Sequence, residues 1–263
     1  MNAPPDPLQS SGNSSLGPPV RRTAADRAPS PGASETGPDG NEWAVWHQRY
    51  VHEPHLQQRL RLVQHATAQA LDEAPPGPVR LLSLCAGDGR DVLPVLSEHP
   101  RGPDVDAVLV ELDPPLAEAA RAASARIPAG RVRVVRADAG LSDSFAGAVP
   151  AEIVLACGVF GNVTDADVER TVRRLPELCA PRATVVWTRG RFPPDLTPAI
   201  RGWFSSAGFE ERAFLPIPDS LHAVGAHRLV RPPDPYRPGE RWFSFLPFDE
   251  RPSNRGRSAR PPG

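Results

Sequence analysis

Apolar and polar positions follow two alternating periods from residue 79 onward. Short apolar runs, typical of buried strands, predict strands at residues 80–85, 106–112, 131–137, 151–157 and 182–189. Between them, apolar residues recur at helical spacing over residues 90–98, 115–125 and 165–178, and a shorter piece follows Leu141. Strands that alternate with helices predict an α/β fold, with a parallel sheet covered on both faces.

The last part of this pattern predicts one more helix and a group of terminal strands. The helix follows Asp195, contains Ile200 and Trp203, and ends at Gly208, since glycine is common just past helix ends. Three strand-like segments come next, separated by turns rich in Pro and Asp. They cover residues 209–215, 222–230 and 241–246.

The two ends of the chain differ from this central domain, which we place at residues 79–248. Residues 1–40 are rich in Pro, Ser, Gly and Ala and predict a disordered tail. Residues 41–78 predict a helical extension, with one helix before Pro54, one helix after it, and a linker at residues 75–78. Residues 249–263 predict a disordered basic tail, because residues 251–263 carry four arginines and no acid.

Composition narrows the function classes. The chain has 263 residues and a net charge of −1, which gives no sign of a nucleic-acid or membrane partner. Its three cysteines are an odd number without a C-x-x-C pair, so neither disulfides nor a metal site is expected. We find no secretory signal pattern and no apolar run of membrane-spanning length, and a reducing, cytoplasmic location is expected.

The glycine turn after the first predicted strand is the first candidate ligand site. Gly87 and Gly89 have no Cβ, so a ligand can lie directly against the backbone. The dinucleotide fingerprint needs a third small residue where this chain has Val92, and Asp88 and Asp91 would repel a diphosphate. A ligand with a cationic end, such as S-adenosylmethionine (SAM), would tolerate both acids. Alternatively, the acids only suit the positive end of a helix dipole.

Two acids follow at the ends of the next two strands, where open α/β sheets bind ligands. Glu111 comes about 20 residues after Gly89, a place where a carboxylate can accept both ribose hydroxyls. Asp138 can accept a hydrogen bond from an adenine amino group, and Ala139 leaves room for the ring. The plainer alternatives are a charged residue that ends a strand and an ordinary turn residue.

A fourth candidate point follows the fourth strand, at residues 157–163. Gly158 and Gly161 let the backbone approach a ligand. Phe160 and Asn162 are candidates to face the reacting centre and the substrate, although Phe160 fits the core equally well.

These four points, in order on consecutive strands, resemble the class I SAM-dependent methyltransferases over residues 79–230. The resemblance implies a Rossmann-like, seven-stranded, mostly parallel sheet of order 3-2-1-4-5-7-6 with an antiparallel terminal strand. It also implies SAM as cofactor. The methionine part would lie on the glycine turn, the ribose on the acid after the second strand (Glu111), and the adenine beside the acid after the third strand (Asp138). The implied cofactor-binding residues are Ser83, Cys85, Gly87, Asp88, Gly89, Glu111, Leu112, Asp138, Ala139, Cys157 and Gly158.

The chain departs from that family at two places. Ser83 stands where the family often has an acid, so it can donate a hydrogen bond but cannot bind the SAM ammonium as a charge; Asp88 or Asp91 could compensate. Cys85 stands where the family often has glycine, and it narrows the turn. Over residues 41–248 the chain is also similar to a group of bacterial SAM methyltransferases, but this resemblance does not identify the methyl acceptor.

Methyl transfer from a sulfonium is an in-line displacement, so the enzyme mainly aligns the reactants and excludes water. A general base is needed only if the acceptor must lose a proton, and His47, Tyr50 and His222 are candidates, with a structural role as the alternative for each histidine. Arg189 is a candidate to hold an acidic substrate group. The aromatic segment at residues 43–50 is expected over the ligand edge, as a substrate lid or as a structural helix.

The class of methyl acceptor can be inferred only from motifs that the sequence lacks. No Asn-Pro-Pro-Tyr or Asp-Pro-Pro-Tyr element follows the fourth strand, and no Pro-Cys pair offers a thiolate for cytosine. A small-molecule or protein acceptor is therefore expected; the methylated atom and the oligomeric state stay open. The alternatives are a non-catalytic SAM-fold binding protein and, less favoured, an NAD(P)-dependent oxidoreductase. The chain has no lysine for the Tyr-x-x-x-Lys pair of the latter.

Overall fold

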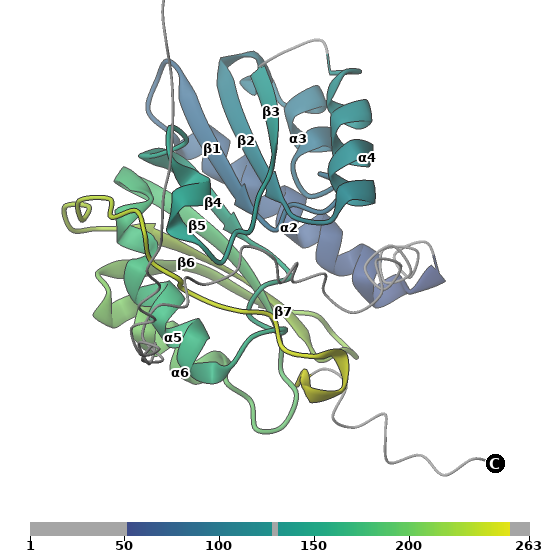
Figure 1. The fold of residues 1–263 in the computed structure, drawn as a ribbon, viewed down its shortest axis with the longest axis vertical. Coiled ribbons are helices and arrows are strands. Elements are labelled where there is room, and N and C mark those ends of the chain that lie inside the picture. Colours follow the sequence, from purple (N-terminus) through teal and green to yellow (C-terminus); the bar gives the residue numbers. More distant parts are fainter. Residues whose placement is uncertain (1–51, 128–130, 253–263) are drawn as a thin grey trace, which may run out of the picture. The chain divides into compact units, whose positions relative to one another are not determined.

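The computed structural model describes residues 52–127 and 131–252, which build a seven-stranded sheet of order β3-β2-β1-β4-β5-β7-β6 (Figure 1). Strands β1 to β5 are parallel, and β7 is antiparallel to both β5 and β6. The predicted fold class and strand order are confirmed. The strands are β1 (Val79–Leu84), β2 (Val105–Glu111), β3 (Arg131–Arg136), β4 (Ala151–Ala156), β5 (Cys179–Gly190), β6 (Phe209–Pro216) and β7 (His222–Leu229).

The central strands β1, β2 and β4 are nearly continuous apolar runs, as expected for parallel strands covered on both faces. β1 pairs with both β2 and β4, so Leu82 lies between Val108 and Val154. The chain builds outward from β1 to β2 and β3 on one side, and from β4 to β5 on the other. Open α/β sheets bind ligands at the carboxyl ends of the strands beside such a reversal.

Helices cover the two faces of the sheet in two groups. Side chains of α2 (Pro54–Glu73), α3 (Leu93–Glu98) and α4 (Pro114–Ser124) pack on one face. Side chains of α5 (Asp165–Arg174) and α6 (Thr197–Ser206) pack on the other, around fully buried aromatic rings. There Trp187 of β5 stacks on Phe204 of α6, with ring centroids 5.8 Å apart. The resulting core fixes where each strand ends.

Side chains also fix the helix ends. The Asp113 carboxylate accepts the Leu116 N–H at the start of α4, and Thr164 accepts the Asp167 N–H at the start of α5. The Arg101 guanidinium closes the end of α2 and the following linker. It donates to four backbone carbonyl oxygens, those of Leu71, Ala74, Pro75 and Gly77.

Three predicted elements differ from the structure. α3 begins at Leu93 rather than at residue 90, because Gly89 accepts the N–H groups of Val92 and Leu93 in a turn. The predicted helix over residues 165–178 ends as α5 at Arg174 and continues as the 3-10 helix η3 (Leu175–Glu177), which contains Pro176. The strand predicted at residues 241–246 is wrong, since only an isolated bridge joins Arg241 to Leu141.

Residues 230–252, which we name the C-terminal strap, start beside Pro176 and Glu177, before β5, and then cross to the carboxyl ends of β3 and β4 (yellow in Figure 1). The strap is anchored by Trp242 and Phe243, which are fully buried. Its Leu246 N–H donates to the carbonyl of Asn162, after β4. The predicted boundary between residues 248 and 249 falls within the 3-10 helix η4 (Phe248–Glu250). The tail predicted at residues 1–40 and the first of the two predicted helices lie outside the described residues.

Candidate functional site

The glycine turn after β1 has the backbone conformation that its glycines predict. The φ angles are +59° at Gly87 and +80° at Gly89, in the left-handed region that favours glycine. A Cβ on Gly89 would lie 2.7 Å from a side-chain carbon of Leu93, so this glycine also permits close packing of α3. Asp88 pairs with Arg90 through hydrogen bonds of 2.5 to 3.2 Å, which balances its charge.

Cys85 adopts φ +52°, which is uncommon for a residue with a side chain. Its side chain packs with the core cluster on the α5 and α6 face, whereas Cys157 belongs to the cluster on the opposite face. Burial raises the pKa of both thiols well above the usual value, with added repulsion from Glu111 at Cys85 and from Asp91 at Cys157. Both cysteines are therefore neutral thiols at neutral pH. Ser83 is buried within β1.

Glu111 joins the ends of β1 and β2. Its Oε2 accepts the Gly87 N–H at 2.7 Å, and its Oε1 accepts the Asp113 N–H at 2.8 Å. Glu111 is 8% exposed, and this burial raises its pKa, while hydrogen bonds from the backbone N–H groups of Asp113, Gly87 and Leu112 lower it. A carboxylate oxygen can accept two hydrogen bonds, so each oxygen of Glu111 retains acceptor capacity for a ligand.

Leu112 follows this buried carboxylate and is 50% exposed. It is one of four exposed large apolar side chains within residues 52–127 and 131–252. Ala139, the small residue predicted beside the adenine ring, is 3% exposed. An exposed leucine beside a buried acid offers a flat apolar group a surface to cover.

Asp138 lies just past the end of β3, and both of its carboxylate oxygens have partners within the protein. Oδ1 accepts the Gly140 N–H at 2.7 Å, and Oδ2 accepts from Arg241 Nη1 at 3.0 Å. Arg241 belongs to the C-terminal strap, 103 residues further along the chain. No local pattern in the sequence pointed to this contact.

The segment after β4 exposes backbone. Gly158 has φ +76° and donates its N–H to Thr188 Oγ1 at 2.9 Å. A Cβ on Gly158 or on Gly161 would meet no atom within 4 Å, so both glycines border open space. The Asn162 side-chain amide donates to the Gly158 carbonyl at 2.5 Å, which holds the turn together.

Two predicted substrate-binding side chains make internal contacts instead of lining open space. The Phe160 ring is fully buried, with its centroid 6.0 Å from that of Trp187. Arg189 is 4% exposed, donates to the Phe160 carbonyl, and lies 3.6 Å from an Asp165 oxygen. Their roles toward a substrate stay predictions.

Of the three predicted general bases, the structure describes His222. His222 begins β7 opposite Gly190, the last residue of β5, and its ring meets the Phe192 ring edge-on. His222 therefore lies at the carboxyl end of β5. His47 and Tyr50 lie outside the described residues.

Arg59 of α2 is a buried charged residue, coupled to Asp91 of the glycine turn, that sequence reasoning missed. It is 7% exposed; burial lowers its pKa, and the neighbouring Asp91 carboxylate raises it. The pKa of Asp91 is in turn raised by burial and lowered by Arg59. The signal was present, because Arg59 is three residues after Leu56 and four before Val63, on the buried face of the helix.

Two other kinds of feature are absent from the described residues. Across residues 52–127 and 131–252, no group of three or more His, Cys, Asp or Glu side chains is arranged to hold a metal ion. The same stretch has no helix with the length and apolar character that a membrane crossing requires.

Comparisons with known proteins agree with this geometry. No family model and no curated protein matches the chain. Among solved structures, the CurJ carbon methyltransferase matches with TM-score 0.58 and 14% identity, over 73% of this chain and 59% of that chain. A possible exported protein from Bordetella parapertussis matches with TM-score 0.54 and 20% identity, over 71% and 72%. Magnesium protoporphyrin IX methyltransferase (ChlM) from Synechocystis PCC 6803, solved with bound SAM, matches with TM-score 0.55 and 11% identity, over 71% and 90%.

The chain has the class I SAM-dependent methyltransferase fold. At these identities the likeness is one of fold, and this chain spans 59% of the CurJ chain. The methyltransferase fold places the carboxyl ends of β1, β2 and β3 at a single edge, where Gly87, Glu111 and Asp138 lie.

Proposed function

We propose that the chain is a SAM-dependent methyltransferase that binds SAM across the carboxyl ends of β1, β2 and β3. Glu111 is the observation that carries this proposal. It is a buried carboxylate, fixed by two backbone N–H groups, that still has acceptor capacity on both oxygens. A ribose diol presents two hydroxyl donors with the spacing that one carboxylate accepts.

The neighbours of Glu111 suit the rest of an adenosyl group. Leu112 offers an exposed apolar side chain for one face of the adenine ring. Asp138 offers carboxylate oxygens for its amino group, and the adjacent Ala139 adds no bulk. Gly87 brings bare backbone against the sugar and the methionine part.

The methionine end of SAM carries an ammonium and a carboxylate, so its site needs both signs of charge. Asp91 and Arg59 supply one carboxylate and one guanidinium close together at the glycine turn. Asp88 is already paired with Arg90, so Asp91 is the better candidate to replace the acid that Ser83 lacks. The same acids disfavour the diphosphate of a nicotinamide dinucleotide. A diphosphate binds best at the N-terminus of a helix directly after the glycine turn, but α3 begins only four residues after Gly89 and is six residues long.

When bound, SAM supplies an electrophilic methyl group on its sulfonium. The chain holds the cofactor through Glu111 and the glycine turn, and orients it toward the segment after β4. Cys85 and Cys157 stay neutral thiols, which are poor nucleophiles and do not compete with the acceptor. His222 is the described candidate for a base if the acceptor must lose a proton. The acceptor is a small molecule or a protein.

The test has two stages. Calorimetric titration of the full chain with SAM, S-adenosylhomocysteine and NADH should show binding of the first two and none of NADH. Binding of NADH without SAM would contradict the proposal. Incubation with methyl-labelled SAM and separate small-molecule and protein extracts should then move label into one of the two. SAM binding without label transfer to either extract would favour the non-catalytic binding protein.

A further inference from the structure

The C-terminal strap forms a second layer on the loop that follows β3. Ser142 donates its N–H to the Glu240 carbonyl at 2.9 Å, and Trp242 donates its N–H to the Gly140 carbonyl at 2.8 Å. The Glu240 N–H donates to Ser142 Oγ at 3.0 Å. Residues 138–142, which we name the adenine loop, are therefore paired with the strap along their backbone.

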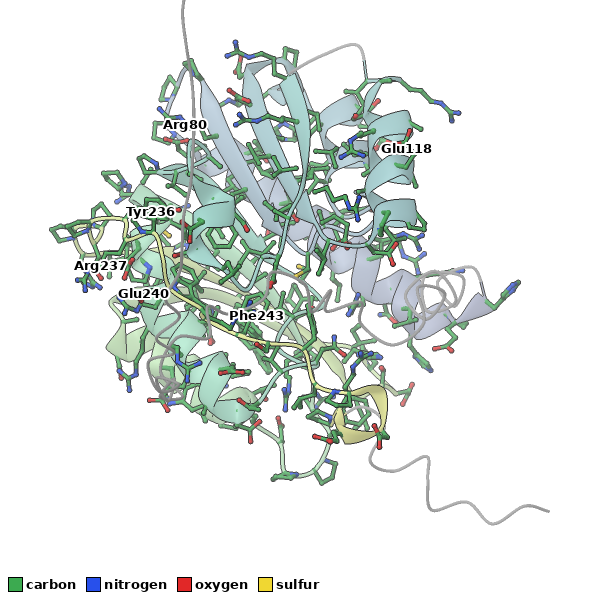
Figure 2. The ribbon with its side chains drawn as sticks, in the orientation of Figure 1. Arg80, Glu118, Tyr236, Arg237, Glu240 and Phe243 are labelled. Atoms are coloured by element: carbon green, nitrogen blue, oxygen red, sulfur yellow. The ribbon has the colours of Figure 1, made fainter. Side chains whose placement is uncertain are left out.

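The strap cannot easily leave this loop, because side chains anchor it on both sides. The Tyr236 hydroxyl donates to the Ser142 carbonyl at 2.5 Å, and Trp242 is fully buried with its ring centroid 5.6 Å from that of Phe145. A Cβ on Gly140 would lie 2.3 Å from the Phe243 carbonyl oxygen, so the strap is in direct contact with the loop. Figure 2 shows Tyr236, Glu240 and Phe243 spaced along the strap.

Within this fixed backbone, Arg241 directs its guanidinium at Asp138. Its Nη1 lies 3.0 Å from Asp138 Oδ2 and 3.4 Å from both the Phe243 carbonyl oxygen and Ser244 Oγ. The Gly140 N–H holds the other oxygen, Oδ1. The Asp138 carboxylate is therefore fixed at both oxygens, and each oxygen can accept one more donor.

We propose that Arg241 is a positioning residue that makes the site specific for adenine. The inference rests on the proposed function, since it assigns the amino group of the SAM adenine to Asp138. Arg241 and the Gly140 N–H together hold the Asp138 carboxylate in one orientation, so that an amino donor is met by a prealigned acceptor. Without Arg241 the carboxylate would rotate on one remaining contact, and a base without an amino group would bind nearly as well.

The experiment compares two ligands that differ at that edge of the base, S-adenosylhomocysteine and S-inosylhomocysteine; in the latter a carbonyl replaces the amino group and N1 carries a proton. Dissociation constants are measured by calorimetry on the full chain. Arg241→Ala should weaken S-adenosylhomocysteine roughly three- to tenfold, the size of one net hydrogen bond, and leave S-inosylhomocysteine unchanged. Arg241→Lys, which keeps a cationic donor, should restore part of the preference.

Arg170→Ala is the matched control. Arg170 donates to the Trp242 carbonyl, so this variant removes a contact with the same strap but none with Asp138. It should leave the ratio of the two dissociation constants unchanged. Arg241→Gln, which keeps a neutral donor, replaces Arg241→Ala if the latter fails to give a cooperative melting transition.

The possible outcomes separate this inference from the proposed function. If Arg241→Ala leaves both dissociation constants unchanged, or weakens both ligands equally, Arg241 is only structural and the inference is wrong. If the wild-type chain binds neither ligand, the proposed function fails instead. A drop in the preference that Arg170→Ala also produces would assign the effect to the strap as a whole and overturn the role of Arg241.

Discussion

The two halves of the carboxyl edge use buried polar groups in opposite ways. At β1 to β3, Glu111 is buried with acceptor capacity to spare, next to the exposed Leu112. At β4 and β5, Arg189 and Phe160 are buried and contact each other. A group with spare capacity is suited to a ligand, whereas a group used internally supports the fold. Substitutions in the first half should therefore change ligand binding, and those in the second half should change stability alone.

The largest expected effect is on stability, in the second half. Arg189→Ala leaves the buried Phe160 carbonyl without this donor and opens space beside it, so the free energy of unfolding should fall by about 2–4 kcal/mol. Urea unfolding measures this change. Arg173→Ala, which removes an exposed pair with Glu169, should cost less than about 0.5 kcal/mol. Equal effects of the two substitutions would remove Arg189 from the structural half.

A pH effect on stability should come from the core behind this second half, between β5 and β7. Trp187 donates to Nδ1 of the buried His227 at 3.1 Å, and burial lowers the pKa of His227 to about 4. Below pH 6.5 the unfolded chain gains a proton at His227 that the folded chain does not, so stability falls from pH 6.5 to about 4. The loss at this residue should reach about 3 kcal/mol.

His227→Gln should remove most of that pH dependence, as measured by urea unfolding at several pH values. The matched change His65→Gln, at an exposed histidine of α2, should leave it in place. A wild-type stability that stays constant over this pH range would show that His227 is not a buried neutral histidine.

In the first half, Glu111→Ala should weaken S-adenosylhomocysteine by about 1–3 kcal/mol, because the ribose hydroxyls lose a charged acceptor. Calorimetry gives the dissociation constant. Glu118→Ala, at an exposed position of α4, removes the same residue type away from the site and should have no effect on binding (Figure 2). An unchanged dissociation constant for Glu111→Ala would exclude Glu111 from the cofactor site.

The smallest expected effect concerns Leu112, the exposed leucine proposed to contact the adenine ring. Leu112→Ala should weaken S-adenosylhomocysteine by about 0.5–1 kcal/mol through lost apolar contact, and should hardly change unfolding because the side chain is half exposed. Leu221→Ala, at a similarly exposed leucine before β7, is the control and should change neither quantity. A loss of stability without a loss of affinity would mean that Leu112 is a packing residue.

The sequence predicted the parts of the molecule that depend on local pattern. The strands themselves, the glycine turn and the acids at residues 111 and 138 follow from apolar runs that end at polar residues. The strand order came from the resemblance to class I SAM-dependent methyltransferases, and the structure confirms it. Contacts between distant segments had no such signal. Arg241 meets Asp138 only because the strap returns across the sheet, and whether the Phe160 ring faces the core or a ligand depends on the position of Trp187.

A crystal structure of the full chain with S-adenosylhomocysteine tests the proposed cofactor site most directly. We expect both ribose hydroxyls within hydrogen-bonding distance of the Glu111 carboxylate, and the adenine ring against Leu112 with its amino group on Asp138. A ligand bound elsewhere, or a ribose that makes no contact with Glu111, would contradict the proposal.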